Sequence, residues 1–386
     1  MSLYLDNNAT TPPDTDVVDV MRKCLLEDWG NPSSAHRAGI AARRRLELAR
    51  SAFCGLVGCD ESQVVFTSGG TEAANLAILG AFRRANDRDP GRTVVACPGT
   101  EHPAVLDSID RCRGLGAEVV RLPVDANGVV DLDSFERLLA ERGESMALCS
   151  VMWANNETGV IQPIERIGAL CREHGVLFHT DAVQWVGREF CDFSRLPIDL
   201  LTCSAHKFHG PKGAGALVIR KGVVLESRAL GGPQERERRG GTENVAAIAG
   251  FGRACELASD WLESGRRREG VSLRDRFETA VLELFDGAVV NGAGAPRIWN
   301  TVNIGFPGLQ AQLLVVVFSE RGLAVSGGAA CASGSLEVSG VLGAMGVEPE
   351  IAAGSLRFSL ARDTSEADVD AALRIIKDVL ESFETS

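Results

Sequence analysis

DLLTCSAHKFHGPKG, residues 199–213, joins an apolar run to a polar turn, and this arrangement decides the fold class. The run fits a buried strand, and the glycines and proline that follow it shape a turn. Other runs in the middle of the chain have the same form, with Gly, Asn, Asp or His at or near their ends. These runs are QVVFTSGG (63–70), RTVVACPGTEH (92–102), AEVVRLPVD (117–125), MALCSVMWANNETG (146–159) and GVLFHTDAVQ (175–184).

Helical patterns lie between these runs, as in TEAANLAILGAFRRA (71–85) and IERIGALCREHG (164–175). Strands that alternate with helices predict parallel βαβ units, with helices on both faces of the sheet. In such α/β folds ligands bind beyond the carboxyl ends of the strands. The polar residues of the runs gather at those ends, so we expect a binding site there.

The C-terminal third follows a different pattern. Residues 255–285 predict one long amphipathic helix, in which the charges of GRRREG (265–270) form a solvated face. Shorter strands follow at 298–306 and 355–362, and a closing helix follows at 366–383. We therefore expect a large domain over 13–255 and a smaller α+β domain made of 1–12 and 256–386, since 386 residues exceed one ordinary core.

Composition narrows the class of protein. Hydrophobic residues make up 45% and charged residues 24% of the chain, as in soluble globular proteins. A net charge of −12 argues against nucleic-acid partners, which bind through cations, although a local basic pocket for a small anion is compatible with it. We expect no export signal, no membrane partner and, since the 11 cysteines show no zinc spacing, no metal. Reduced thiols point to the cytoplasm or an equivalent organelle matrix.

Lys207 is the first candidate for chemistry. An arbitrary lysine is most often a surface residue, but this one follows an apolar strand between His206 and His209, before a Gly/Pro turn. A lysine at a strand end forms a Schiff base with an aldehyde cofactor when its pKa is lowered. Such a cofactor, pyridoxal phosphate, needs a phosphate cradle, a carboxylate for its ring nitrogen and a group against its ring.

Each of these needs has a candidate with a plainer alternative. The segment Ser68-Gly69-Gly70-Thr71 leads from a strand into a helix and suits a phosphate, although Thr71 and Glu72 also suit simple helix capping. Asp181 suits the ring nitrogen, or else a helix N-cap.

Three further side chains suit the same ligand. Gln184 lies one helical turn beyond Asp181 and reaches that ligand, while His102 suits the ring face and proton transfer, or else a structural role. Asn156, in WANNETG, suits a phenolic oxygen or a substrate carboxylate, or else an ordinary loop.

Cys331 lies in SGGAACASGS (326–335), where small residues offer little packing. A free cysteine is usually a small buried hydrophobe, and we expect Cys149, Cys171 and Cys203 to be core residues of that kind. The glycines and alanines around Cys331 instead suit a loop that carries a thiol to a substrate and then to a partner.

Taken together, these motifs resemble the cysteine desulfurase family, the NifS/IscS-like group of class V aminotransferases. The resemblance covers nearly the whole chain, and it also includes the cysteine segment. Its motifs are YLDNNATTPP (4–13), WGNPSSAHRAG (29–39), FTSGGTEAANLAI (66–78), TEHPAVLDS (100–108), SVMWANNETGVIQP (150–163), FHTDAVQWVG (178–187), SAHKFHGPKGAGALVIRKG (204–222), GGPQERERRGGTENVAAIAGFGRA (231–254) and GSLRFSLARDTSEADVD (354–370).

The resemblance implies a fold-type I enzyme, with a mainly parallel seven-stranded sheet flanked by helices and a smaller α+β C-terminal domain. It implies that Lys207 bears the cofactor and moves a proton, that His102 stacks on the ring, and that Asp181 pairs with the ring nitrogen. Gln184 and Asn156 would address the phenolic oxygen and the substrate carboxylate. Gly70, Thr71, Ser204 and His206 would hold the phosphate, and Arg357 would bind the substrate carboxylate. Thr242 would reach the cofactor of the other subunit of a homodimer.

The implied reaction takes sulfur from L-cysteine, leaves L-alanine, and places a persulfide on Cys331. The sulfur would go to an iron–sulfur scaffold protein or another sulfur acceptor. A selenocysteine lyase or aminotransferase in which Cys331 is dispensable is the enzymatic alternative, and a non-catalytic binding module is the other. The chain departs from the family at Ala329, Ala332, Trp185 and Phe208, which bears on rate and acceptor rather than on the cofactor.

Overall fold

The computed structural model describes residues 3–327 and 339–384. Its main sheet has seven strands in the order β2-β8-β7-β6-β5-β3-β4, and only β8 runs against its neighbours. The mainly parallel seven-stranded sheet that the family resemblance implies is therefore confirmed. The strands are β2 (Val64–Thr67), β3 (Val94–Pro98), β4 (Glu118–Leu122), β5 (Met146–Ser150), β6 (Leu177–Asp181), β7 (Leu200–Ser204) and β8 (Gly215–Ile219).

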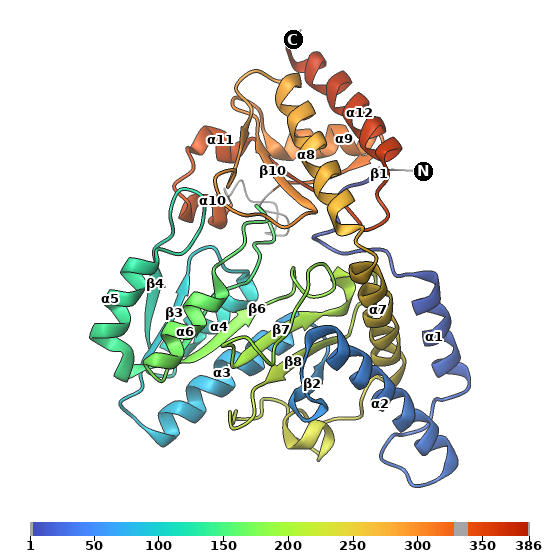
Figure 1. Cartoon of the computed structure of the whole chain (residues 1–386), viewed down its shortest axis with the longest axis vertical. Coiled ribbons are helices and arrows are strands. Elements are labelled where there is room, and N and C mark those ends of the chain that lie inside the picture. Colours follow the sequence, from blue (N-terminus) through green and yellow to red (C-terminus); the bar gives the residue numbers. More distant parts are fainter. Residues whose placement is uncertain (1–2, 328–338, 385–386) are drawn as a thin grey trace.

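Helices cover both faces of this sheet (Figure 1). Successive residues of β2 show why, because Val64 and Phe66 join one buried cluster while Val65 joins another. Parallel strands packed on both faces are apolar throughout, which explains the continuous apolar runs of the sequence. The helices of this part are α1 (Thr15–Leu26), α2 (Arg37–Val57), α3 (Gly70–Arg88), α4 (Pro103–Arg113), α5 (Leu132–Arg142), α6 (Ile164–Glu173) and α7 (Val245–Glu263), with short 3₁₀ turns η1 (Glu61–Gln63), η2 (Gly143–Ser145), η3 (Ala205–Lys207) and η4 (Gln234–Glu237).

The C-terminal residues form a second sheet, with the order β12-β13-β10-β9, in the upper part of Figure 1. The N-terminus joins this part, since β1 pairs in parallel with β11. The elements are β1 (Leu3–Tyr4), β9 (Val289–Val290), β10 (Thr301–Gly305), β11 (Leu323–Ala324), β12 (Ser326–Gly327), β13 (Ser355–Ser359), α8 (Arg267–Leu284), α9 (Ala311–Glu320), α10 (Gly340–Ala344), α11 (Pro349–Ala353) and α12 (Glu366–Glu384). None of the described helices is both long and apolar enough to cross a membrane.

The single helix predicted over 255–285 is wrong. The structure has two helices there, α7 and α8, and the chain turns between them at Gly265, whose φ is +76°. Glycine adopts this left-handed conformation without the steric penalty of a Cβ atom and commonly ends a helix. Since α7 packs on α2 and α8 packs on α12, the turn marks the passage from the main sheet's helices to the C-terminal part.

Candidate active site

A cavity of about 190 Å³ opens beyond the carboxyl ends of β6 and β7. This is the edge where the sequence predicts a ligand site. The cavity brings together every residue predicted to bind the cofactor except Thr242. Its lining consists of Gly70, Thr71, His102, Ala104, Met152, Asn156, Asp181, Val183, Gln184, Ser204, His206 and Lys207.

Lys207 lies at the end of η3, which continues directly from β7. Its Nζ donates to the backbone oxygens of Asn8, at 2.6 Å, and Ala9, at 3.0 Å. Burial, followed by the positive charges of Arg188 and Arg357, lowers the pKa of this amine to about 8. The lowered pKa leaves part of the amine neutral near neutral pH, and the neutral form can act as a nucleophile and a base.

Asp181 is the last residue of β6 and is buried. No helix follows it, so the N-cap alternative is wrong; its Oδ1 accepts instead from the backbone N–H of Val183, at 2.9 Å, within a turn. Burial raises the pKa of this carboxyl, while the neighbouring His102 and Lys207 lower it. Asp181 has no ion-pair partner within 3–327 and 339–384, and a buried carboxylate of this kind is suited to a cationic ring nitrogen of a ligand.

Gln184 belongs to the same turn rather than to a helix. Its Nε2 donates to the backbone oxygen of Asn8 at 3.0 Å, and its Oε1 accepts from Arg188. The helical spacing expected between Gln184 and Asp181 is therefore wrong, although the turn does bring both residues to one cavity.

His102 is the N-cap of α4, followed by Pro103 at the first helical position. Its Nδ1 accepts from the backbone N–H of Ala104 at 3.1 Å, which leaves the proton of a neutral ring on Nε2. Burial lowers the pKa of His102, so the ring is neutral at physiological pH. His102 therefore has the structural role of a helix cap, and its ring also lines the cavity, while its role against a cofactor ring stays a prediction.

The cradle predicted around Gly70 lies at the start of α3, where backbone N–H groups lack helical partners. A Cβ at Gly70 would lie 2.8 Å from Val183 Cγ2, so glycine is needed for this close approach. Glu72 accepts from the N–H of Ser68, at 2.8 Å, one residue before the N-cap Gly69, and pairs with Arg239; these two contacts account for this side chain.

Two polar side chains face the cradle from η3 and the end of β7. Ser204 Oγ is buried and has no hydrogen-bond partner among the described residues. His206 Nδ1 lies 3.1 Å from Thr10 Oγ1, and burial, followed by Lys207, lowers its pKa to about 4. A hydroxyl without a partner beside free helix N–H groups suits a phosphate.

Arg357 lies on β13 and approaches the site from the C-terminal part. Its Nη1 donates to the backbone oxygen of Asn156 at 3.0 Å, and its Nη2 pairs with Asp6 Oδ1 at 2.6 Å. Arg357 Nε and Asn156 Oδ1 are both buried without a partner among the described residues. These atoms are suited to a carboxylate and to a hydrogen-bond donor of a ligand.

Thr242 is exposed in the segment between η4 and α7 and does not line the cavity of its own chain. Cys331 lies outside the described residues, as do Ala329 and Ala332. Trp185 stacks on Trp153 at 4.3 Å between ring centroids. Cys149, Cys171 and Cys203 are buried core residues, as predicted.

Sequence reasoning missed two residues that organise the site, Asn8 and Arg188. Asn8 supplies the oxygen that binds both Lys207 and Gln184, and Arg188 binds Asn8 in turn. Asn8 carried a signal only as part of the motif NNATT. Arg188 carried none, because a lone arginine in a loop reads as a surface charge.

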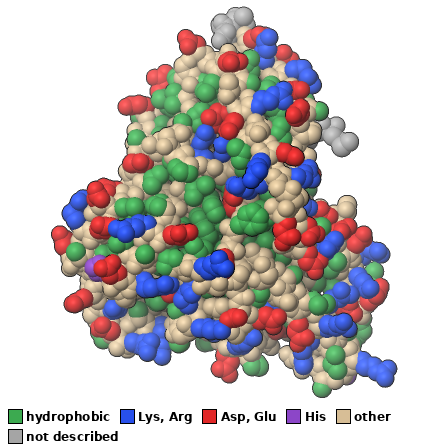
Figure 2. Space-filling view, viewed as in Figure 1, with side chains coloured by type: hydrophobic (Ala, Val, Ile, Leu, Met, Phe, Trp, Pro, Cys, Tyr) green, Lys and Arg blue, Asp and Glu red, His purple; other side chains and the backbone are tan. Residues whose placement is uncertain are grey.

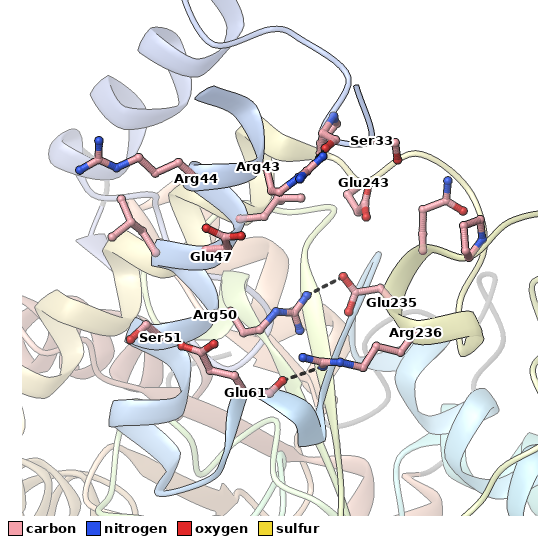
Figure 3. A pocket seen from close by; sticks show the side chains of 15 residues that line it. Ser33, Arg43, Arg44, Glu47, Arg50, Ser51, Glu61, Glu235, Arg236 and Glu243 are labelled. Carbon is pink, nitrogen blue, oxygen red and sulfur yellow. Dashed lines mark hydrogen bonds and ion pairs between the residues drawn. The ribbon is translucent and has the colours of Figure 1, made fainter. Parts of the chain in front are cut away.

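A second hollow lies between α2 and η4 (Figure 3). Arginines and glutamates line it together, with an ion pair at 2.7 Å between Arg50 and Glu235 and a hydrogen bond at 2.9 Å from Arg236 to the backbone oxygen of Glu61. Glu235, Arg236 and Glu237 all have positive φ, which is unusual for residues other than glycine. The buried Glu235 carboxylate, which also accepts from the Phe66 N–H at 2.9 Å, holds this strained turn in place.

The chain is similar to known proteins over its whole length. The family model Aminotransferase class-V matches residues 3–372. A cysteine desulfurase of Bradyrhizobium diazoefficiens is 44% identical over 100% of this chain and 96% of its own. A solved NifS-like protein has a TM-score of 0.90 and 36% identity, covering 99% of this chain and 100% of its own. The structure of SspA in complex with cysteine has a TM-score of 0.80 and 30% identity, covering 94% and 100%. The chain therefore belongs to the class-V aminotransferase family and, within it, to the cysteine desulfurases.

Proposed function

We propose that this protein is a pyridoxal-phosphate-dependent cysteine desulfurase, which takes sulfur from L-cysteine and releases L-alanine. The observation that carries the proposal is the placement of the Lys207 amine. This amine faces a cavity that also contains Asp181, His102, Ser204 and the start of α3. Each group that a pyridoxal phosphate site needs is present within one cavity.

The residues present fit this cofactor. The Ser204 hydroxyl and the N–H groups at the start of α3 would bind the phosphate. Gly70 has no side chain there that would overlap with Val183. Asp181 would hold a proton on the ring nitrogen, His102 would lie against the ring, and Gln184 would face the phenolic oxygen. Asn156 would address the phenolic oxygen or the substrate carboxylate through the N–H groups of its amide. Arg357 Nε, which has no partner among the described residues, would donate to the substrate carboxylate.

Bound pyridoxal phosphate supplies a ring that stabilises negative charge developing at the substrate α-carbon. Residues of this chain would transfer the proton and orient the substrate. Lys207 releases and takes up a proton at the α-carbon, since its lowered pKa keeps part of the amine neutral. Arg357 orients the substrate through its carboxylate, a planar pairing that lysine does not provide.

Cys331 is proposed as the sulfur acceptor on the resemblance of its sequence alone, because it lies outside the described residues. Its thiolate would attack the sulfur of L-cysteine, so that the carbon–sulfur bond breaks and a sulfur–sulfur bond forms. The carbon released takes a proton and leaves as L-alanine. The persulfide sulfur would pass to an iron–sulfur scaffold protein or another sulfur acceptor.

A homodimer completes the proposal, with Thr242 of one subunit at the phosphate of the other. Thr242 is exposed and lies beyond the strained turn at 235–237, which Glu235 anchors. Leu25, Leu26 and Trp29 leave an apolar surface at the end of α1, with exposed fractions of 64%, 66% and 72%. Exposed apolar groups of this kind commonly mark protein contacts.

We further propose the cytoplasm as the location and no nucleic-acid or membrane partner. Every cysteine within 3–327 and 339–384 is free, which supports a reducing compartment.

The test is incubation of the protein with pyridoxal phosphate, L-cysteine and a thiol reductant. We expect a coloured protein that releases equal amounts of alanine and sulfide, with Lys207 trapped by borohydride reduction. Lys207→Ala should abolish both the reducible adduct and turnover. A wild-type protein that stays colourless would support the binding-module alternative and overturn the proposal.

Cys331→Ser separates a desulfurase from a lyase or aminotransferase. We expect this variant to bind the cofactor normally but to lose alanine formation. Sulfide release at the wild-type rate would show that Cys331 is dispensable and that the persulfide step is wrong.

A further inference from the structure

Arg188 is a buried arginine whose guanidinium binds four neutral oxygens. Its side chain lies in the turn region after β6, and the residue is 4% exposed. Nη1 donates to Asn8 Oδ1 at 2.7 Å and to Gln184 Oε1. Nη2 donates at 2.9 Å to the backbone oxygens of both Asn7 and Lys207. One side chain thus connects the N-terminal segment, the turn after β6 and η3.

The charge of Arg188 has no ion-pair partner among the described residues. Burying a guanidinium costs several kcal/mol even with a partner, so an unpaired one is unusual. Burial and the nearby Arg357 lower the pKa of Arg188 to about 9, which still leaves it charged at neutral pH. A fold that tolerates this cost beside a reactive amine points to a role in the site.

The contacts of Arg188 converge on the amine of Lys207. The Nζ donates to the backbone oxygens of Asn8 and Ala9, and Arg188 holds Asn8 through its side-chain oxygen. Arg188 also binds the backbone oxygen of Lys207 itself. Trp299 Nε1 donates to the backbone oxygen of Arg188 at 3.0 Å and fixes the arginine in turn. Arg188 therefore fixes both the lysine and one of its acceptors.

Several charged groups face the amine from different elements. After burial, Arg188 and then Arg357 lower the pKa of Lys207, while Asp181 and Asp6 raise it. The imidazoles of His102 and His206 also lie near, and burial lowers the pKa of each, so neither adds a charge at neutral pH. Among these charged groups, Arg188 therefore lowers the pKa of the amine most.

We propose that Arg188 is a positioning residue for Lys207, which holds the turn of Asn7 and Asn8 around the amine and supplies a fixed positive charge that favours its neutral form. The proposal deepens the proposed function, because it rests on Lys207 as the reacting amine. Hydrogen bonding alone does not explain why this buried residue is a cation, since a neutral amide could donate to some of the same acceptors. The effect of its charge on the amine does explain it.

The test measures the amine directly in cofactor-free, full-length protein. Trace acetylation with acetic anhydride over about pH 6 to 10, read by peptide mass spectrometry, gives the titration midpoint of Lys207, with the exposed Lys23 as internal reference. We expect a wild-type midpoint near 8. In Arg188→Met the loss of a like charge should raise the midpoint by about one pH unit. Arg188→Lys keeps the charge and should stay near the wild-type midpoint.

Arg274→Met is the matched control. Arg274 is also buried and donates to the backbone oxygens of Arg297 and Ile298, but it lies on α8 and does not act on the amine. Unlike Arg188 it has an ion-pair partner, Asp275, at 2.6 Å. Its loss should leave the midpoint of Lys207 unchanged. If Arg188→Met does not fold, Arg188→Gln replaces it, since glutamine keeps a donor group but not the charge. We expect the same rise in the midpoint of Lys207 in this variant.

An unchanged midpoint in folded Arg188→Met or Arg188→Gln overturns the inference, as does an equal shift in Arg274→Met. The assay contains no cysteine, so its outcome is separate from that of the proposed function. If the wild type releases no sulfide but the midpoint still shifts, the proposed function fails and the assignment of Arg188 stands.

Discussion

At the scale of single residues, Ser204 carries a buried hydroxyl with no partner in the described part of the chain. We expect Ser204→Ala to weaken binding of pyridoxal phosphate about tenfold or more, because a hydrogen bond to a charged phosphate contributes about 1.5–3 kcal/mol. The stability of the cofactor-free protein should hardly change, since the hydroxyl makes no hydrogen bond there. An absorbance titration with the cofactor measures the affinity.

Ser108→Ala is the control for this prediction. Ser108 is equally buried, but its hydroxyl donates within α4 to the backbone oxygen of Ala104, at 2.7 Å. Its removal should leave cofactor affinity unchanged. Equal affinities for wild type and Ser204→Ala would rule out Ser204 as a phosphate ligand.

Glu157 gives a prediction on pH and stability. Burial raises the pKa of its carboxyl to about 7, while Oε2 accepts from Ser339 Oγ at 2.5 Å. The folded protein therefore holds this proton more tightly than the unfolded chain, so stability is lost as the pH rises from about 4.5 through about 7. Glu157→Gln should remove up to about 3 kcal/mol of that pH dependence.

Urea unfolding of cofactor-free protein across this pH range measures the effect. Glu173→Gln, on the exposed end of α6, is the control and should keep the wild-type slope. A Glu157→Gln curve parallel to that of the wild type would contradict the assignment.

Residues of the site differ in how far their positions could be predicted. Lys207, Asp181 and Ser204 follow apolar strands directly, so the rule for parallel sheets places them at one edge. Asn8 and Arg188 escape that rule, because each reaches the site through contacts with segments more than 170 residues away or through a turn of irregular geometry. Pattern reasoning finds residues that strands position and misses residues that tertiary contacts position.

At the scale of elements, the turn after β6 packs against η3 through Gly187. Its φ is +79°, and a Cβ there would lie 2.5 Å from Phe208 Cγ. We expect Gly187→Ala to destabilise the protein by about 2–4 kcal/mol, from the left-handed backbone and the overlap together. In a Phe208→Ala background the same change should cost less, because the overlap with the Phe208 ring is gone, while the backbone penalty and the contact at 2.8 Å with the Cβ of residue 208 remain.

Urea denaturation of the four proteins in this cycle gives the coupling. Equal costs in the two backgrounds would show that Phe208 does not restrict Gly187. The bulky Phe208, a departure from the family pattern beside Lys207, would then need another explanation.

The break between α7 and α8 shows the limit of periodicity at this scale. Apolar residues recur at helical spacing across Gly265, and a single glycine costs a helix only about 1 kcal/mol, so the pattern favours one helix. The break arises from the two packing partners, α2 and α12, which lie in different parts of the molecule. Local sequence holds no information on those partners.

At the scale of the whole molecule, the homodimer proposal predicts complementation between two defective subunits. Lys207→Ala lacks the reacting amine but keeps Thr242, and Thr242→Ala has the reverse defect. In a heterodimer, the site with an intact Lys207 receives an intact Thr242 from its partner. After equal mixing and exchange, about a quarter of all sites should regain wild-type cofactor affinity and activity.

Titration of the mixture at limiting cofactor, with each variant alone as control, counts these sites. Mixtures that behave as the average of the two variants would show that Thr242 does not act across subunits.

The mainly parallel sheet was predictable at this scale from alternating strands and helices. The distribution of charge on the surface was not predictable from the net charge of −12. Acidic and basic side chains are interspersed over the face shown in Figure 2.

The pairing of β1 with β11 also sets an order of events during synthesis. Leu3 pairs with Leu323, and the Asn8 N–H binds Ser359 Oγ at 2.9 Å, so the first residues made are anchored by some of the last. At about 5–20 residues per second, the ribosome needs tens of seconds to make the intervening chain. The N-terminal segment whose backbone oxygens receive the Lys207 amine is held by Arg188 and Gln184 as well, but it gains its last anchors only as translation ends. A nascent chain would carry Lys207 in an unfinished pocket, so that capture of the proposed cofactor would follow synthesis rather than guide it.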